Sequence, residues 1–195
     1  SIYPGSWNLF KFNKRQNRNN KDIEFLHLGT LYGTRNLDNL FSAIDYLKEN
    51  NKDNRRIQSI KIVNCGDIYL DNKDDYLNRN DFELIRCKSR KDALIRASKS
   101  NYLLLVQHID KRSQETIPYK FYDYLNLNIP IFAICNNNEL EKLVLKSGGI
   151  ISKASKTKSI IKSIRSLLDK KNISPFLNKS KLKFDIQEQL SKAID

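Results

Sequence analysis

The sequence predicts an α/β fold: a Rossmann-like, doubly wound parallel sheet of about six strands with helices on both faces, in a single domain. Three observations lead to it. Short apolar runs of strand length alternate with amphipathic stretches of helical length along the chain. A glycine turn, GTLYGTRN, follows the first apolar run, as at the start of a nucleotide-binding βαβ unit. The 195 residues suffice for one sizeable core but not for two full domains.

The first half of the chain provides three strands and three helices. Strands are expected at residues 23–28, 57–63 and 82–86. The apolar stripe of the first helix comprises Leu37, Leu40, Phe41, Ile44 and Leu47. Asn36 can cap that helix. A short charged helix is expected at residues 71–78, and Ser89 can cap a third helix.

The second half alternates in the same way. Strands are expected at residues 102–106 and 129–135 and in the short segment GGII. A helix should start near Thr116 and Pro118, since threonine caps helices and proline suits a first turn. Another is expected at residues 139–147. The stripe of the last one comprises Ile160, Ile161, Ile164, Leu167 and Leu168.

The two ends of the chain differ from the middle. Residues 1–22 are polar and irregular, which indicates a linker or surface segment. Residues 23–172 form the expected Rossmann-like domain. Residues 173–195 form a C-terminal extension whose apolar residues, four apart, predict an amphipathic helix. The chain begins without Met, and we expect it to be a piece of a longer protein.

Charge alone leaves several partners open. Lys and Arg number 35 against 22 Asp and Glu, giving a formal net charge of +13. This favours anionic partners: nucleic acid, an acidic membrane surface or phosphate-bearing ligands. A Lys- and Asn-rich proteome would explain the same balance without any function.

Cysteine and histidine usage argues against metal and nucleophile chemistry. Cys65, Cys87 and Cys135 are odd in number, form no CxxC pair and each sit at the end of an expected strand. We therefore expect neither a disulfide framework nor a metal site, and a reducing cytosol fits best. His27 is expected to be structural, and His108 lacks a Ser or Cys placed as a nucleophile.

Candidate ligand-binding residues lie in the loops at the carboxyl ends of the strands. These loops read GTLYGTRN, NCGD, RCKSRKD and VQHIDKRSQETIP. Glycine turns and helix starts offer backbone amides to phosphates, and Arg35 adds a fork-shaped donor that can neutralise a diphosphate. Alternatively, Arg35 is a surface cation near a helix start, where the helix dipole disfavours it.

Two carboxylates lie around the start of the helix that follows residue 116. Glu115 and Asp123 have seven residues between them, and both can accept hydrogen bonds from ribose or sugar hydroxyls. The alternatives are an ion pair of Asp123 with Lys120 on the same helix and a solvated Glu115 that offsets the helix dipole. Two roles are therefore open for Lys120: it binds phosphate, or it forms an ion pair with Asp123.

Four stretches of the chain resemble a known family. They read FLHLGTLYGTRNLDNLFSAIDYL, DALIRASKSNYLLLV, ETIPYKFYDYLNLNIPIFAI and NNNELEKLVLKSGGII. Over roughly residues 23–170 the chain resembles the C-terminal domain of family 4 retaining glycosyltransferases, which have the GT-B architecture. The third stretch is the most specific, because it resembles the pattern I-P-x-K-h-h-E-Y, where h is hydrophobic.

The resemblance implies that this domain binds a nucleotide-diphosphate sugar. The E-x7-E motif of the family would fall on Glu115, which would touch the donor sugar, and Asp123, which would hold the ribose. Arg35 and Glu115 would be the catalytic residues, with Arg35 steadying the leaving diphosphate. The resemblance also implies four further groups of substrate-binding residues. These are the glycine turn (Gly29 and Thr30), the main chain that receives the base (Arg86 and Cys87), the amides of the helix start (Thr116 and Ile117) and the side chain of Lys120.

Two departures from the family pattern matter. Asp123 is one methylene shorter than the usual Glu, and the lysine that often follows the arginine by a few residues is absent. Lys120 is a candidate to take its place.

The resemblance also implies a setting. We expect a transferase that works in cell-surface polysaccharide or glycan synthesis, without cofactor or metal, in the cytoplasm or peripherally at the anionic inner face of the membrane. An N-terminal acceptor-binding domain would be missing from this chain, so the fragment alone would be inactive. The alternative is a basic α/β module that binds nucleic acid or anionic lipid without catalysis; under the glycosyltransferase interpretation no nucleic acid is expected.

Overall fold

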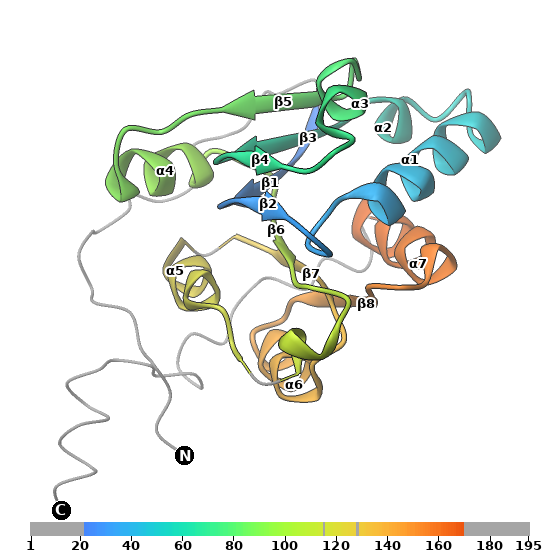
Figure 1. The fold of residues 1–195 in the computed structure, drawn as a ribbon. Coiled ribbons are helices and arrows are strands. Elements are labelled where there is room, and N and C mark those ends of the chain that lie inside the picture. Colours follow the sequence, from blue (N-terminus) through green and yellow to red (C-terminus); the bar gives the residue numbers. More distant parts are fainter. Residues whose placement is uncertain (1–21, 115, 128, 170–195) are drawn as a thin grey trace, which may run out of the picture.

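The computed structural model describes residues 22–114, 116–127 and 129–169, and in these ranges it contains a six-stranded, all-parallel sheet (Figure 1). The strand order is β5-β3-β1-β6-β7-β8. The strands are β1 (Ile23–Leu28), β3 (Ile60–Cys65), β5 (Phe82–Ile85), β6 (Tyr102–Val106), β7 (Ile131–Cys135) and β8 (Ile150–Lys153). The predicted fold class is confirmed, and the order reverses direction at β1 and β6, where doubly wound sheets bind ligands.

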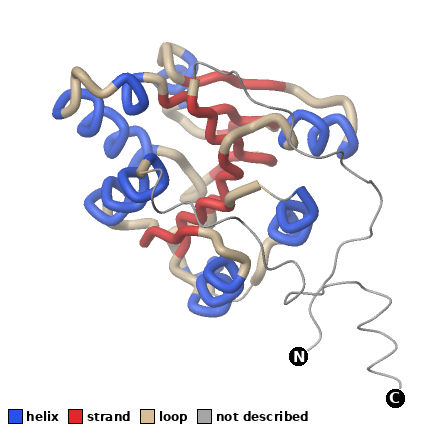
Figure 2. Tube along the Cα trace, turned by 180° about the vertical axis from the view of Figure 1, so that it is seen from behind, coloured by secondary structure: helices blue, strands red, loops and turns tan. Residues whose placement is uncertain are grey.

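Helices cover both faces of the sheet (Figures 1 and 2). One face packs against α1 (Asp38–Asn50), α2 (Arg55–Gln58), α3 (Lys73–Leu77) and α7 (Thr157–Leu168). The other packs against α4 (Arg90–Ala97), α5 (Tyr119–Leu127) and α6 (Asn138–Lys146). A short 3-10 turn, η1 (Lys111–Ser113), lies between β6 and α5. Both faces therefore bury apolar side chains.

The central strands supply residues to both cores. Phe25 of β1 stacks on Tyr102 of β6 with ring centroids 4.7 Å apart, and it meets Phe132 of β7 edge-on. Leu26, the next residue, points into the core under α4, α5 and α6. This alternation, with every residue of β6 and β7 buried, is what a doubly covered parallel sheet requires.

Several element boundaries differ from the prediction. β3 starts at residue 60 because the side chain of Asn54 accepts hydrogen bonds from the amides of Arg56 and Ile57, which starts α2 there instead. α5 starts at Tyr119, later than the predicted Thr116 and Pro118. β2 (Leu31–Tyr32) and β4 (Ile68–Tyr69) were not predicted; they pair in parallel as a separate two-stranded sheet.

The helix-capping predictions had mixed outcomes. Ser89 caps α4, since its hydroxyl oxygen accepts a hydrogen bond from the Asp92 amide at 3.1 Å. The N-cap of α1 is Leu37, without a side-chain cap, although the Asn36 side chain still accepts from the Asp38 amide at 3.3 Å. The predicted apolar stripe of α1 is fully confirmed, because all five of its residues are buried.

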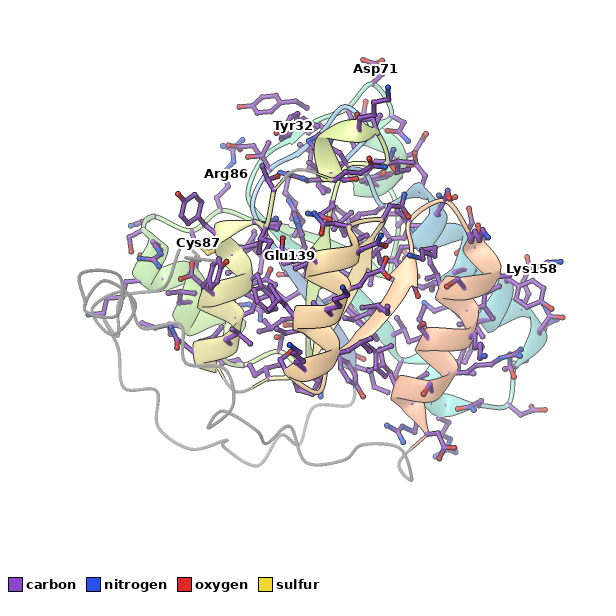
Figure 3. The ribbon with its side chains drawn as sticks, turned by 90° about the horizontal axis from the view of Figure 1, so that it is seen from below. Tyr32, Asp71, Arg86, Cys87, Glu139 and Lys158 are labelled. Atoms are coloured by element: carbon purple, nitrogen blue, oxygen red, sulfur yellow. A yellow bond between two sulfur atoms is a disulfide. The ribbon has the colours of Figure 1, made fainter. Side chains whose placement is uncertain are left out.

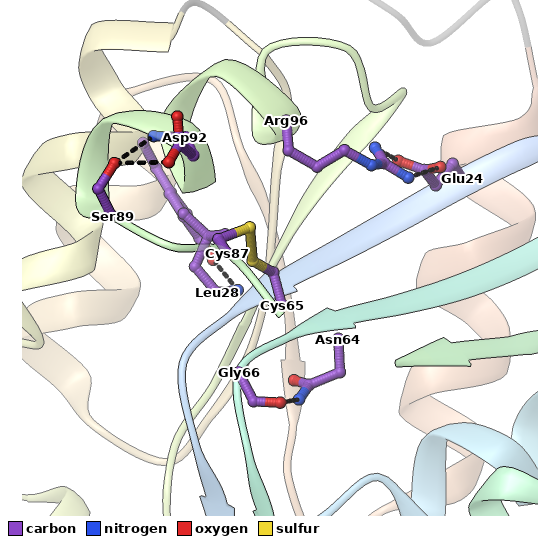
Figure 4. Close-up of a disulfide and its surroundings, with 10 residues drawn as sticks. Glu24, Leu28, Asn64, Cys65, Gly66, Cys87, Ser89, Asp92 and Arg96 are labelled. Atoms are coloured by element: carbon purple, nitrogen blue, oxygen red, sulfur yellow. Dashed lines mark hydrogen bonds and ion pairs between the residues drawn. A yellow bond between two sulfur atoms is a disulfide. The ribbon is translucent and has the colours of Figure 1, made fainter. Parts of the chain in front are cut away.

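One cysteine prediction is wrong. Cys65, at the end of β3, and Cys87, just after β5, form a disulfide with their Cα atoms 6.5 Å apart (Figure 4). The pairing is possible because β3 and β5 are neighbours in the sheet, so the segments leaving them stay close. Cys135 is free and buried, and burial raises the pKa of its thiol to about 12.

The remaining predictions concern the two ends of the chain, membrane-spanning helices and metal sites. The predicted linker at residues 1–22 and the extension at residues 173–195 lie outside them, apart from Asp22. No helix in the described part is both long and apolar enough to cross a bilayer. The same part contains no cluster of three or more His, Cys, Asp or Glu side chains suited to a metal ion.

Candidate functional site

Two glycine turns meet at the carboxyl ends of β1 and β3. Gly29 follows β1 with φ at +116°, and its amide donates to the carbonyl of Cys65 at 2.9 Å. Gly66 follows β3 with φ at +149°, and a Cβ there would lie 2.6 Å from the carbonyl carbon and oxygen of Gly29. Only glycine fits such a close approach of two backbones. Main chain therefore forms this part of the sheet edge.

Arg35 is held in the loop between β1 and α1. Its backbone exchanges two hydrogen bonds with Tyr32, of 3.0 and 3.1 Å, and its guanidinium carbon lies 5.1 Å from the centre of the Tyr32 ring. The Arg35 Nε is buried and has no hydrogen-bond partner among the described residues. A buried donor without a partner is costly, so this position favours an acceptor supplied from outside.

Lys120, in the first turn of α5, extends to the glycine turn after β1. Its Nζ lies 2.8 Å from His27 Nε2 of β1 and 3.3 Å from the position that a Cβ on Gly29 would take. Burial and the nearby Arg35 charge lower the pKa of Lys120 to about 7. Within the described part of the chain, neither cation forms an ion pair, so the suggested pairing of Lys120 with Asp123 is not what the structure shows.

A buried polar chain orients the His27 imidazole. The Asn64 amide nitrogen donates to the carbonyl of Gly66 at 3.0 Å, so the Asn64 oxygen is the atom that faces His27 Nδ1, at 2.6 Å. That oxygen can only accept, so Nδ1 carries the proton and Nε2 accepts from Lys120. Burial and Lys120 lower the pKa of His27 well below its usual value. His27 is thus neutral and structural, as predicted.

Asp123 forms an ion pair with Arg90 rather than with its helix neighbour. Both carboxylate oxygens accept from the Arg90 guanidinium, one of them from Nε at 3.3 Å. Arg90 is the first residue of α4, so the pair bridges α4 and α5. The Asp123 side chain is 14% exposed and that of Arg90 52%. The carboxylate is therefore partly covered, and the arginine lies on the solvent side.

The loop after β6 is tied to the Arg35 loop. The Thr34 hydroxyl donates to an Asp110 carboxylate oxygen at 2.6 Å and therefore accepts from His108 Nδ1 at 3.0 Å. The His108 ring also meets the Tyr32 ring edge-on, with centroids 4.8 Å apart. Because Thr34 donates its proton to Asp110, His108 does not activate it as a nucleophile.

The remaining predicted residues lie along the same edge. Gly29, Thr30 and Arg35 share the loop after β1. Arg86 is 81% exposed and lies 3.7 Å from an Asp67 carboxylate oxygen. Figure 3 shows Arg86 and Cys87 on the Tyr32 side of the molecule and Lys158 of α7 on the opposite side.

Other predicted positions are shifted or lie outside the described residues. Thr116 and Ile117 precede α5, and the carbonyl of Thr116 accepts from the side chain of Gln107 at 3.0 Å. Glu115 is outside the described residues. Sequence reasoning missed the roles of Asn64 and Arg90, since both act through partners distant in sequence.

Comparison with known proteins identifies the fold. No protein-family model matches the chain, and no curated protein sequence does. Solved structures do match: WaaG, a glycosyltransferase involved in lipopolysaccharide biosynthesis, has a TM-score of 0.63 at 12% identity over 89% of this chain and 46% of WaaG. Anabaena HepE in complex with UDP-glucose has a TM-score of 0.64 at 11% identity over 89% of this chain and 48% of HepE.

A third match has a different activity. The UDP-GlcNAc 2-epimerase of Methanocaldococcus jannaschii, in complex with UDP-GlcNAc and UDP, has a TM-score of 0.52 at 16% identity, over 89% of this chain and 46% of the epimerase. The chain thus spans less than half the length of each of these proteins. At such identities the likeness establishes the fold alone: a Rossmann-like domain of the GT-B type.

Proposed function

We propose that this chain is the donor-binding domain of a retaining glycosyltransferase of family 4, which transfers a sugar from a nucleotide-diphosphate sugar to an acceptor. The observation that carries the proposal is the position of Lys120 beside the glycine turn after β1, where the charge of Arg35, 85 positions away in sequence, is close enough to lower the pKa of Lys120. Arg35, whose buried Nε has no described partner, and Lys120, which has no described acid beside it, favour a dianionic ligand at this edge.

Asp123 provides the second half of the proposed site. Its carboxylate can accept the paired hydroxyls of a ribose, provided that the ligand shares or displaces the exposed Arg90 side chain. The loop of Arg86 and Cys87, which is fixed to β3 by the disulfide, is proposed to receive the base. Glu115 is proposed to contact the donor sugar.

Positioned cations would act on the leaving group. As the bond to the sugar breaks, negative charge builds up on the departing diphosphate, and Arg35 and Lys120 would stabilise it. Each such preorganised donor can contribute ~3 kcal/mol to transition-state stabilisation. Thr116 and Ile117 precede α5, so the backbone amides at this helix start are proposed to add to the same effect.

Transfer is favoured over epimerisation by the chain's own residues. UDP-GlcNAc 2-epimerases share the fold, so the fold does not separate the two activities. The stretch around Pro118, Lys120 and Asp123 carries the glycosyltransferase resemblance, and Lys120 and Asp123 belong to the site described above. A nucleic-acid or lipid module is not favoured, because Lys120 lies partly buried beside Gly29 and within range of the Arg35 charge, whereas such a module would line an exposed surface with cations.

Calorimetric binding of sugar nucleotides tests the proposal. We expect one of UDP-glucose, GDP-mannose, CDP-glucose and ADP-glucose to bind, and we expect Arg35→Ala to weaken that binding about tenfold or more, since a hydrogen bond to a charged group contributes about 1.5–3 kcal/mol. Lys158→Ala is the matched control, because it removes an exposed cation on the far side. Equal affinities for the Arg35 variant and the control would refute the role.

The domain is also proposed to need a second domain for turnover. The matched glycosyltransferases are more than twice as long as the region shared with this chain. We therefore propose that the acceptor is bound by a domain outside this chain, that the isolated chain transfers no sugar, and that the whole enzyme acts in cell-surface glycan synthesis.

A further inference from the structure

We propose that the diphosphate site takes up a proton when it binds a sugar nucleotide, and that Lys120 receives it. The proposal rests on the proposed function and adds a chemical property of the site. The balanced step is simple: the lone pair of a neutral Lys120 amine takes a proton from a buffer acid in solution, and the resulting ammonium pairs with a diphosphate oxygen. No other bond forms or breaks.

The hydrogen-bond network around Lys120 accommodates both protonation states. His27 Nε2 can only accept, because Asn64 fixes the proton on Nδ1. A neutral amine and an ammonium can each donate one N–H to that nitrogen. The contact at 2.8 Å is therefore kept in either state. What changes is the side of Nζ that faces away from His27: a lone pair in the neutral form, a third donor in the charged form.

The charges near Lys120 favour the neutral form in the absence of ligand. Arg35 is the charge that, together with burial, brings the pKa of Lys120 to about 7. Asp123 lies three positions further along α5, but Arg90 already neutralises it. Glu115 lies outside the described residues. A diphosphate placed against Arg35 and Lys120 reverses the sign of the local field, which draws a proton onto the amine.

His27 and Tyr124, two titratable side chains around Lys120 on β1 and α5, do not change charge near neutral pH. His27 is neutral because its pKa is lowered well below its usual value. Tyr124, one turn further along the same face of α5, has its pKa raised by burial, and its hydroxyl lies between the Leu28 amide and the Leu104 carbonyl. In the neighbouring loop, Thr34 joins the side chains of His108 and Asp110. Lys120 is thus the group placed to respond.

Calorimetry in two buffers tests the proposal directly. The sugar nucleotide that binds in the screen described above is titrated at about pH 7.5 in HEPES and in Tris, whose heats of ionisation differ. Sugar nucleotides suit this test, since their diphosphate carries no proton that titrates near pH 7. We expect an uptake of roughly 0.7 proton per ligand, because a group with a pKa of about 7 is mostly neutral at that pH.

Two variants assign the proton. Lys120→Arg keeps a permanent charge, so its binding should show no uptake and should not weaken between pH 6.5 and 8.5, whereas wild-type affinity should fall about 25-fold over that range. Lys120→Met should bind more weakly and also without uptake. Lys158→Met serves as the control and should retain the wild-type uptake. The wild-type measurement stands even if a variant is unstable.

The outcomes separate the two proposals. Tight binding with equal apparent heats in the two buffers would overturn the proton uptake and leave the proposed function intact. Uptake that persists in Lys120→Arg would assign the proton to another group and overturn the role of Lys120. Binding of none of the four sugar nucleotides would overturn the proposed function and the proton uptake together.

Discussion

Replacing Lys120 by methionine should change how the stability of the domain depends on pH. In the unfolded chain the Lys120 amine has a pKa of about 10.5, against about 7 when folded. Between these values the unfolded state binds more protons, so the free energy of unfolding of the wild type rises with pH, by up to about 1.4 kcal/mol per pH unit. The methionine side chain would contribute no such slope, while its unbranched chain fills much of the same space.

The expected magnitude follows from the two pKa values. Between pH 7 and pH 9 the lysine should contribute about 2 kcal/mol of pH-dependent stability to the wild type, relative to the variant. His27 stays neutral throughout this window, because its pKa is lowered well below 6.5. Below the window both proteins should lose stability as the pH falls, since protonation of His27 then favours the unfolded state.

Urea unfolding at pH 7, 8 and 9 measures the effect. The difference in unfolding free energy between wild type and Lys120→Met should shift by about 2 kcal/mol across the series in favour of the wild type. Lys158→Met, which removes an exposed lysine of α7, should follow the wild type at every pH. Parallel pH curves for wild type and Lys120→Met would show that Lys120 is charged in the folded protein, and the electrostatic reasoning would fail.

Two further predictions concern Asp123 and the cysteines. Asp123→Asn should weaken sugar-nucleotide binding roughly tenfold by calorimetry, whereas Arg90→Ala, which frees the carboxylate, should not; equal losses would mean that the ion pair acts only in packing. Thiol titration of the urea-unfolded, unreduced protein should find one free thiol, Cys135, and in the native protein this thiol should react slowly because burial raises its pKa to about 12. Three thiols in the unfolded protein would contradict the disulfide between Cys65 and Cys87.

Hydrophobic periodicity predicted most of the fold. The strands of residues 23–28 and 102–106 match β1 and β6 in both bounds, since continuous apolar runs mark doubly covered strands. β2 and β4 are two residues long, too short to show any period. Ile57 looks like the start of a strand, yet the Asn54 cap places it in a helix.

Only those parts of the site whose residues lie close together in the sequence could be predicted. The glycine turn and Arg35 stand out in the sequence because a single loop contains both. The contact of Lys120 with His27 joins residues 93 positions apart and depends on how α5 packs on β1. Helical spacing offered Lys120 as the partner of Asp123, but Arg90 of another helix is the actual one, since spacing can suggest only partners within the same helix.

The disulfide was missed for a related reason. An odd number of cysteines and the absence of a CxxC motif argued against pairing. The useful signal was the position of Cys65 and Cys87, each at or just after the end of an expected strand. Only the observed order, in which β3 and β5 are neighbours, shows that these two ends lie side by side.

The contact between Gly29 and Gly66 bears on how such a domain can diversify. Because a Cβ on Gly66 would collide with the Gly29 carbonyl, peptide groups form this part of the proposed site, and Gly66 cannot be replaced without moving them. Arg86 and Arg90, by contrast, lie exposed around it and can be replaced without disturbing the core. Under the proposed function, related chains should therefore vary at Arg86 and Arg90, and with them in the base or sugar they prefer, while the two glycines are retained.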